Sequence, residues 1–115
     1  MKHLKKGRKF GRKKNQRRAL KKSLATSFFM LGKIKTTEAK AKELRPFVEK
    51  FLSRAKNPTL ANKRILRKFF PTAVIKKILE YADSFKERNG GYTRIIKLGV
   101  RKSDSARVAI IELVK

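Results

Sequence analysis

The basic side chains near the start of the chain are the residues whose types and spacing could do the most distinctive chemistry. Residues 2–22 contain twelve lysines and arginines, and the first acidic residue is Glu38. Ammonium and guanidinium groups at this density can neutralise the phosphates of a polyanion, and the planar guanidinium fork can bind a phosphate bidentately. A stretch this basic buries too little apolar surface to fold alone. We therefore expect it to be held in place by a partner.

The charge of the whole chain narrows the class of partner. Lysine and arginine number 34 against 8 acidic residues in 115, a formal charge of +26, which repels itself in a compact chain and favours a polyanion. No window of 18 residues is apolar enough to span a bilayer, and we expect no secretory signal. Cysteine is absent, which excludes disulfides and thiolate metal sites and fits a reducing interior. Nucleic acid is the partner that remains favoured.

The residues that could catalyse a reaction are few and scattered. His3 is the only histidine and lies in the most basic stretch, whereas a Ser-His-Asp site needs a rigid imidazole. The acids stand singly beside lysine or arginine, as salt-bridge partners on helix surfaces do, so metal-assisted hydrolysis is not indicated. Gly90 and Gly91 are followed by no Lys-Ser/Thr pair, so they predict a turn rather than a phosphate loop. We predict no enzyme, no cofactor and no metal.

The elements that position the basic stretch begin with a helix over residues 11–31. Its first half carries positive charge on every face, and its second half carries an apolar stripe of Leu20, Leu24, Phe28 and Leu31. Gly32 is expected to end it. Residues 33–37 alternate as a short strand does.

Three further helices and two strands are predicted after residue 37. Thr37 suits the N-cap of a helix over residues 38–56, and Pro46 should kink that helix near Arg45 or break it in two. Asn57 and Pro58 should cap and open a helix to residue 70, and Thr72 should open another to residue 88. The apolar face of the helix over residues 38–56 should consist of Leu44, Val48, Phe51, Leu52 and Ala55.

Residues 92–100 and 107–114 read as two strands joined by a polar hairpin loop at 102–105. Alternation predicts that Ile96 and Leu98 face the helices, together with inward residues of the second strand, and that Glu112 points away. Those inward residues are Ala109, Ile111 and Leu113.

Several segments, spread from end to end, resemble bacterial large-subunit ribosomal protein seventeen. They are residues 1–3 (MKH), 34–37 (IKTT), 40–45 (KAKELR), 90–95 (GGYTRI) and 111–114 (IELV). The resemblance implies an α+β fold in the order α-β-α-α-α-β-β, which the residue patterns also give. It implies a small mixed three-stranded sheet packed against helices, with a basic N-terminal helical extension. We predict one domain over residues 1–115, with an RNA-binding extension at 1–18 and a folded core at 19–115.

The resemblance also implies a function. The chain is expected to be a structural constituent of the large ribosomal subunit that binds and stabilises its RNA near the rim of the peptide exit tunnel. The expected partners are large-subunit ribosomal RNA and neighbouring large-subunit ribosomal proteins, in the cytoplasmic ribosome of a bacterium. No membrane, small-molecule substrate or homo-oligomer is expected. Two other classes that share the charge are a nucleoid DNA-binding protein and a secreted heparin-binding protein.

The predicted RNA-contacting residues are mainly basic, because structured RNA is recognised through its backbone and shape, with exposed bases stacking on arginine or aromatic planes. Phe10 and Tyr92 are the stacking candidates, although Phe10 suits a core position about as well. Gln16 stands where the resemblance implies histidine, and its amide can hydrogen-bond but cannot titrate. The predicted set is Lys2, His3, Lys5, Arg8, Lys9, Phe10, Arg12, Lys13, Lys14, Gln16, Arg17, Arg18, Lys35, Arg45, Tyr92 and Arg94.

Overall fold

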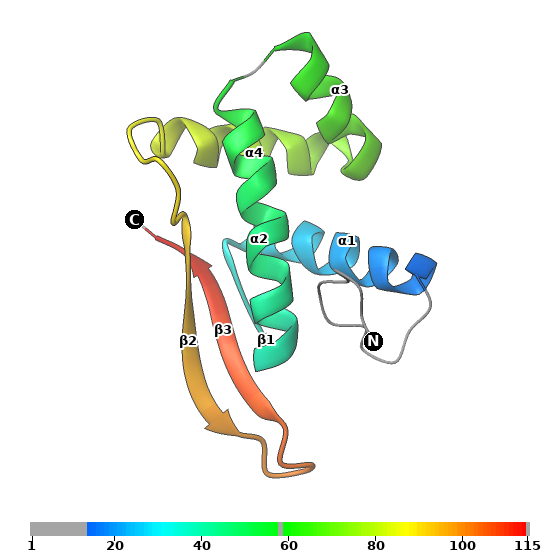
Figure 1. The fold of residues 1–115 in the computed structure, drawn as a ribbon, viewed down its shortest axis with the longest axis vertical. Helices are drawn as coiled ribbons and strands as arrows, with labels where there is room; N and C mark the ends of the chain where they lie inside the picture. Colours follow the sequence, from blue (N-terminus) through cyan, green and yellow to red (C-terminus); the bar gives the residue numbers. More distant parts are fainter. Residues whose placement is uncertain (1–13, 58, 115) are drawn as a thin grey trace, which may run out of the picture.

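The computed structural model describes residues 14–57 and 59–114, so predictions that concern residues 1–13, Pro58 and Lys115 lie outside the described residues. The described elements confirm the α+β class and the predicted order (Figure 1). They are α1 (Lys14–Leu31), β1 (Lys33–Thr37), α2 (Glu38–Ala55), α3 (Leu60–Phe69), α4 (Thr72–Ser84), β2 (Thr93–Val100) and β3 (Arg107–Leu113).

The sheet has the strand order β1-β3-β2, and both neighbouring pairs are antiparallel. The prediction of a mixed sheet is therefore wrong. The chain crosses over from β1 to β2 through three helices, and these two strands do run in the same direction. They never pair, because β3 returns from the hairpin and lies between them.

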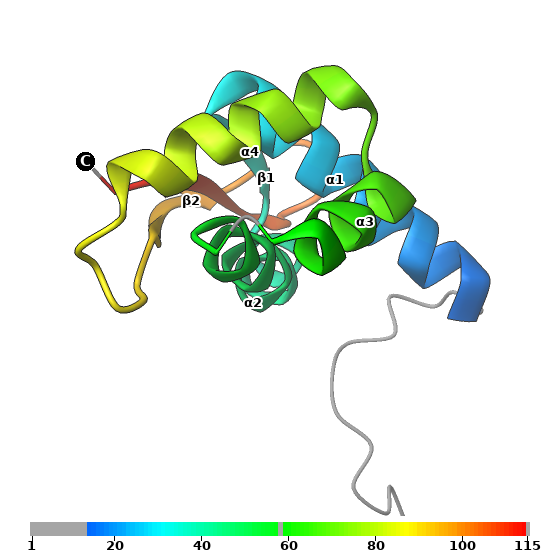
Figure 2. The same ribbon diagram turned by 90° about the horizontal axis from the view of Figure 1, so that it is seen from above.

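Helix α2 lies over one face of the sheet and is the centre of the core. Figure 1 shows α4 crossing behind α2, and Figure 2 gives the view along α2. The helix begins at the predicted cap, where Lys40 N donates to Thr37 Oγ1 over 3.4 Å. It runs through the exposed Pro46 as one helix, which excludes the predicted alternative of two separate pieces. Its five predicted apolar residues are all buried, as are Ala41 and Glu38.

The second half of α1 packs into the core through a face that the predicted stripe describes only in part. Phe28 is fully buried as predicted, but Leu31 is 72% exposed and Phe29 is buried in its place. Phe29 meets Phe70 edge to face, with ring centroids 5.6 Å apart. Gly32 ends the helix as predicted: its N–H donates to Phe28 O over 2.7 Å, and its φ of +81° favours glycine.

Helix α3 begins two residues later than predicted. Thr59 rather than Asn57 is its N-cap, and Thr59 Oγ1 accepts from Asn62 N over 3.3 Å. Asn57 contributes its carbonyl instead, which accepts from Asn62 Nδ2 over 2.7 Å. The next helix also differs, because α4 ends at Ser84 and the chain then turns through residues 85–87.

The inward face of β2 is the opposite of the predicted one. Thr93 and Ile95 pair with Leu113 and Ile111 and pack toward the helices, whereas Ile96 is 42% exposed. Leu98 is also exposed, next to a register shift between Lys97 and Gly99. The inward residues of β3 and the outward direction of Glu112 agree with the prediction, since Ala109 and Ile111 are buried and Glu112 pairs with Arg94.

Candidate nucleic-acid interface

The first turns of α1 carry the only part of the predicted basic stretch that falls within the described residues. Lys14, Gln16 and Arg18 are exposed, and Arg17 is half-buried. Figure 1 shows these turns, in blue, extending away from α2 and the sheet. The remaining predicted contacts of this stretch lie outside the described residues, and they are Lys2, His3, Lys5, Arg8, Lys9, Phe10, Arg12 and Lys13.

The basic turns are held firmly because the other half of α1 is part of the core. Phe28 and Phe29 are fully buried and meet edge to face with centroids 5.5 Å apart. Lys21 adds an ion pair with Glu43 of α2, at 3.4 Å between Nζ and Oε1. A helix anchored at one end presents its exposed cations in a fixed direction, so little order has to be gained when phosphates bind.

Arg45 stabilises the fold through two contacts, and its side chain is also partly exposed to solvent. Its Nε donates to Glu49 Oε2 over 3.2 Å, and its Nη2 donates to the carbonyl of Thr93 over 3.2 Å. The side chain is still 46% exposed. Because a guanidinium has five N–H donors, Arg45 can bind a phosphate without giving up these two contacts.

Lys35 and Arg94 lie on the sheet face that points away from α2. Lys35 of β1 pairs in register with Ile110, and Arg94 of β2 pairs with Glu112, one step further along β3. Arg94 Nε donates to Glu112 Oε1 over 2.7 Å, yet the arginine side chain is 59% exposed. The structure therefore places these two residues on a surface separate from the first turns of α1.

Tyr92 is the one described candidate that the structure removes from the interface. It is only 2% exposed, and its ring packs against Phe85 at 5.2 Å between centroids. Stacking on a base would require the core to open, so that role is corrected to a structural one. Hydrogen bonding from Ser53 and the nearby Lys56 ammonium lower the pKa of the Tyr92 hydroxyl.

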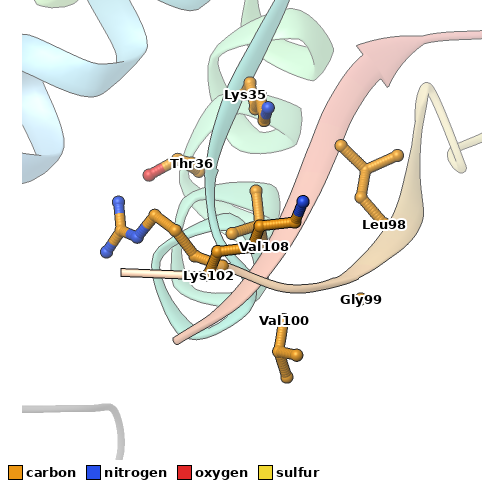
Figure 3. Close-up of a pocket in the computed structure, with 8 residues that line it drawn as sticks. Lys35, Thr36, Leu98, Gly99, Val100, Lys102 and Val108 are labelled. Atoms are coloured by element: carbon orange, nitrogen blue, oxygen red, sulfur yellow. The ribbon is translucent and has the colours of Figure 1, made fainter. Parts of the chain in front are cut away.

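A shallow hollow of about 450 Å³ lies where the β2–β3 hairpin curls over β1. Figure 3 shows Lys35 and Thr36 of β1 on one side, Leu98 of β2 on the other and Val108 between them. Arg101 on its rim forms two 3.0 Å contacts with Asp104, and this pairing holds the pKa of that carboxyl below its usual range. The lining offers basic, aliphatic and backbone groups but no pair of groups suited to acid–base catalysis.

Metal-binding and membrane-spanning features are not found in the part of the chain that the structure describes. Residues 14–57 and 59–114 contain no cluster of three metal-ligating side chains. Over the same residues, no helix is long and apolar enough to cross a membrane.

One group of basic residues was missed by the sequence reasoning. Helix α3 exposes two lysines and two arginines on a single face, far from the N-terminal stretch in sequence. The signal that could have revealed it is the absence of any acid from residue 50 to residue 79. The residues are Lys63, Arg64, Arg67 and Lys68.

Comparison with known proteins gives one consistent result. The family model described as Ribosomal protein L17 matches residues 20–114. The protein of Gemmatimonas aurantiaca named Large ribosomal subunit protein bL17 is 48% identical over 116 aligned positions, covering 99% of this chain and 98% of that protein. The protein of the same name from Pelobacter propionicus is 46% identical, covering 100% of this chain and 92% of that protein. The one from Fusobacterium nucleatum is 47% identical and is covered over its whole length.

Proposed function

The chain belongs to the ribosomal protein L17 family, and from this premise we propose that it binds and stabilises the RNA of the large ribosomal subunit. As a member of this family it is a structural constituent of the large subunit rather than an enzyme, and its place is the cytoplasmic ribosome of a bacterium. The proposal concerns how it does this work: by neutralising phosphates and by fitting the shape of folded RNA.

The observation that carries the proposal is the imbalance between cations and acids. Lysine and arginine number 34 against 8 acids, and six of those acids form ion pairs within the fold, so an excess of 26 positive charges is left without a negative partner in the chain itself. Folded RNA supplies the missing negative charge, and the release of its condensed counterions supplies much of the binding free energy. The paired acids are Glu38, Glu43, Glu49, Asp83, Asp104 and Glu112.

The extension at residues 1–18 is the proposed principal contact, and the anchored half of α1 gives it direction. It joins Lys14 and Arg18, exposed on the first turns of α1, to the eight predicted contacts before residue 14. Arg45 adds exposed N–H donors beside the sheet. Lys35 and Arg94 add a third basic site on the outward sheet face. Three separate basic sites suit the surface of a folded RNA, because proteins recognise such RNA through its backbone and shape.

The proposed site on the subunit is near the rim of the peptide exit tunnel, among neighbouring large-subunit proteins. This location is supported by the family resemblance of the terminal and central segments.

Co-sedimentation with ribosomal subunits tests the proposal. The tagged full chain, expressed in a bacterium, should sediment with large subunits at moderate salt and leave them at high salt, because phosphate contacts weaken as salt rises. Treatment with ribonuclease should release it, and treatment with deoxyribonuclease should not. Release by deoxyribonuclease alone, or absence from the large-subunit fraction at low salt, would contradict the proposal.

A further inference from the structure

Helix α3 presents an uninterrupted basic face. Lys63 and Arg64 are followed one turn later by Arg67 and Lys68, and all four side chains are exposed. Residues three and four apart lie on the same side of a helix, so the four cations form one compact surface, called here the α3 face. Figure 1 places α3 at the end of the molecule opposite the β2–β3 turn.

The four cations of the α3 face form no ion pair among the described residues, although Lys63 lines one hollow together with Glu80 and Asp83 of α4. Ion pairs among the described residues join α1 to α2, β2 to β3, and β2 to α2, and none of them includes a residue between 50 and 79. No acid occurs in that stretch of sequence. An ordinary solvated helix surface mixes both signs of charge, so the α3 face is not explained as one.

The arrangement of these cations is unfavourable in the free protein. Lys63 repels Arg67 and Arg64 repels Lys68, because like charges four residues apart destabilise a helix. Lys63 and Arg64 also stand in the first half of α3, where the helix dipole favours negative charge. Only Arg67 and Lys68, in the last turn, suit the dipole. A bound polyanion would reverse each of these effects.

The fold nevertheless holds α3 rigidly under its charges. Leu66 is 1% exposed, and the Phe69 ring meets Phe51 at 5.0 Å between centroids. Asn62 Nδ2 donates to the carbonyls of Asn57 and Arg54, which ties the start of α3 to the end of α2. The inward face is therefore used for packing, and the outward face is free for a partner.

We propose that the α3 face binds the phosphate backbone of a segment of large-subunit RNA, as a second contact apart from the N-terminal extension. This deepens the proposed function and rests on it. The face carries no aromatic side chain, so it should contact phosphates without reading base sequence. With contacts on α1 and on α3, the protein bridges two RNA segments and holds them at a fixed separation.

The test compares two full-length variants that each lose four positive charges. In the first, the four cations of the α3 face become Gln, which keeps helix propensity and leaves the inward face unchanged. The control replaces four cations elsewhere that form no ion pair among the described residues: Lys33→Gln, Lys40→Gln, Lys102→Gln and Arg107→Gln. Binding to large-subunit RNA is measured over a range of salt, with circular dichroism melting to verify folding.

Loss of the α3 contacts should make the slope of log K against log salt shallower by roughly 3, since each phosphate contact contributes about 0.7–0.9. The control should change the slope by less than about 1. An α3 variant that matches the wild type, or that matches the control, overturns the α3 contact. Failure of the wild-type chain to bind the RNA at all would instead overturn the proposed function.

A second measurement does not depend on removing charge. The chain has no native cysteine, so Arg64→Cys and Lys14→Cys each supply one attachment point for an iron chelate that cleaves nearby RNA. Both tethers should cut large-subunit RNA in the reconstituted complex, at two different sets of nucleotides. Cleavage from position 14 without cleavage from position 64 would contradict the second contact.

Discussion

Thr93 Oγ1 donates a 2.9 Å hydrogen bond to Glu49 Oε2, and this contact joins β2 to α2. Arg45 closes the group, because its Nε donates to the same carboxylate oxygen and its Nη2 donates to the Thr93 carbonyl. A residue predicted only as an RNA contact thus also fixes the position of the sheet against its covering helix. Arg45 thus stabilises the fold in addition to making its proposed contact with RNA.

Thr93→Val should destabilise the fold by about 1–3 kcal/mol, because it removes a buried hydrogen bond to a charged group without changing side-chain volume much. Thr93 is 2% exposed, so water cannot replace the lost donor. Thr36→Val in β1 is the matched control and should change the free energy of unfolding by less than about 0.5 kcal/mol. Urea unfolding measures both variants, and equal losses would show that the Thr93–Glu49 contact contributes nothing.

Pro46→Ala should stabilise the isolated protein by roughly 2 kcal/mol. Helix α2 is continuous through Pro46, and alanine restores an N–H donor while relieving the clash one turn back. Part of this gain is offset because proline restricts the unfolded chain. Thermal melting decides the matter, and a lower Tm for the variant would mean that the fold requires the proline at this point.

The sequence predicted those parts of the fold in which local signals agree with one another. For α2, the threonine cap and the spacing of the apolar residues both pointed to one helix and one buried face, and both were right. The cap of α3 was misplaced because Asn57 and Thr59 are both good cap residues and only the surrounding contacts choose between them. Glycine after α1 was placed well, since its backbone conformation excludes most other residues.

The errors lie where tertiary contacts decide between similar local patterns. Ile95 and Ile96 are both apolar, so alternation could not set the face of β2, and the buried Thr93–Glu49 bond selects it. The buried position of Tyr92 and the insertion of β3 between β1 and β2 depend on distant parts of the chain. The α3 face was missed for another reason, because its signal, the absence of acids from residue 50 to residue 79, is visible in the sequence and was not used.

Glu38→Gln should change how stability depends on pH. The hydrogen bond from Lys42, with further help from Lys97, lowers the pKa of the Glu38 carboxyl in the folded state. A depressed folded-state pKa stabilises the fold above the unfolded value, about 4.3 for glutamate, and this stabilisation disappears as pH falls through the folded value. The wild type should therefore melt higher than the variant at neutral pH, and the difference should close in acid.

Melting temperatures measured from neutral pH down to below the folded-state pKa of Glu38 check this prediction. Glu80→Gln is the control, because Glu80 is exposed and forms no ion pair among the described residues. Its melting profile should follow the wild type at every pH. A constant gap between wild type and Glu38→Gln would show that the ion pairs do not stabilise the fold.

The most direct test of the central claim is the salt dependence of RNA binding by the full chain and by a chain that lacks residues 2–16. The deletion removes eight positive charges and none of the core residues that the structure describes, so its melting temperature at low salt should stay level or rise. For the full chain, log K should fall against log salt with a slope of roughly −4 to −7. The truncated chain should bind roughly 100-fold more weakly at moderate salt, with a shallower slope that reflects the remaining contacts of the α3 face, Arg45, Lys35 and Arg94. Equal affinity and equal slope for the two chains would contradict the account, because the folded domain alone would then be the principal RNA-binding element.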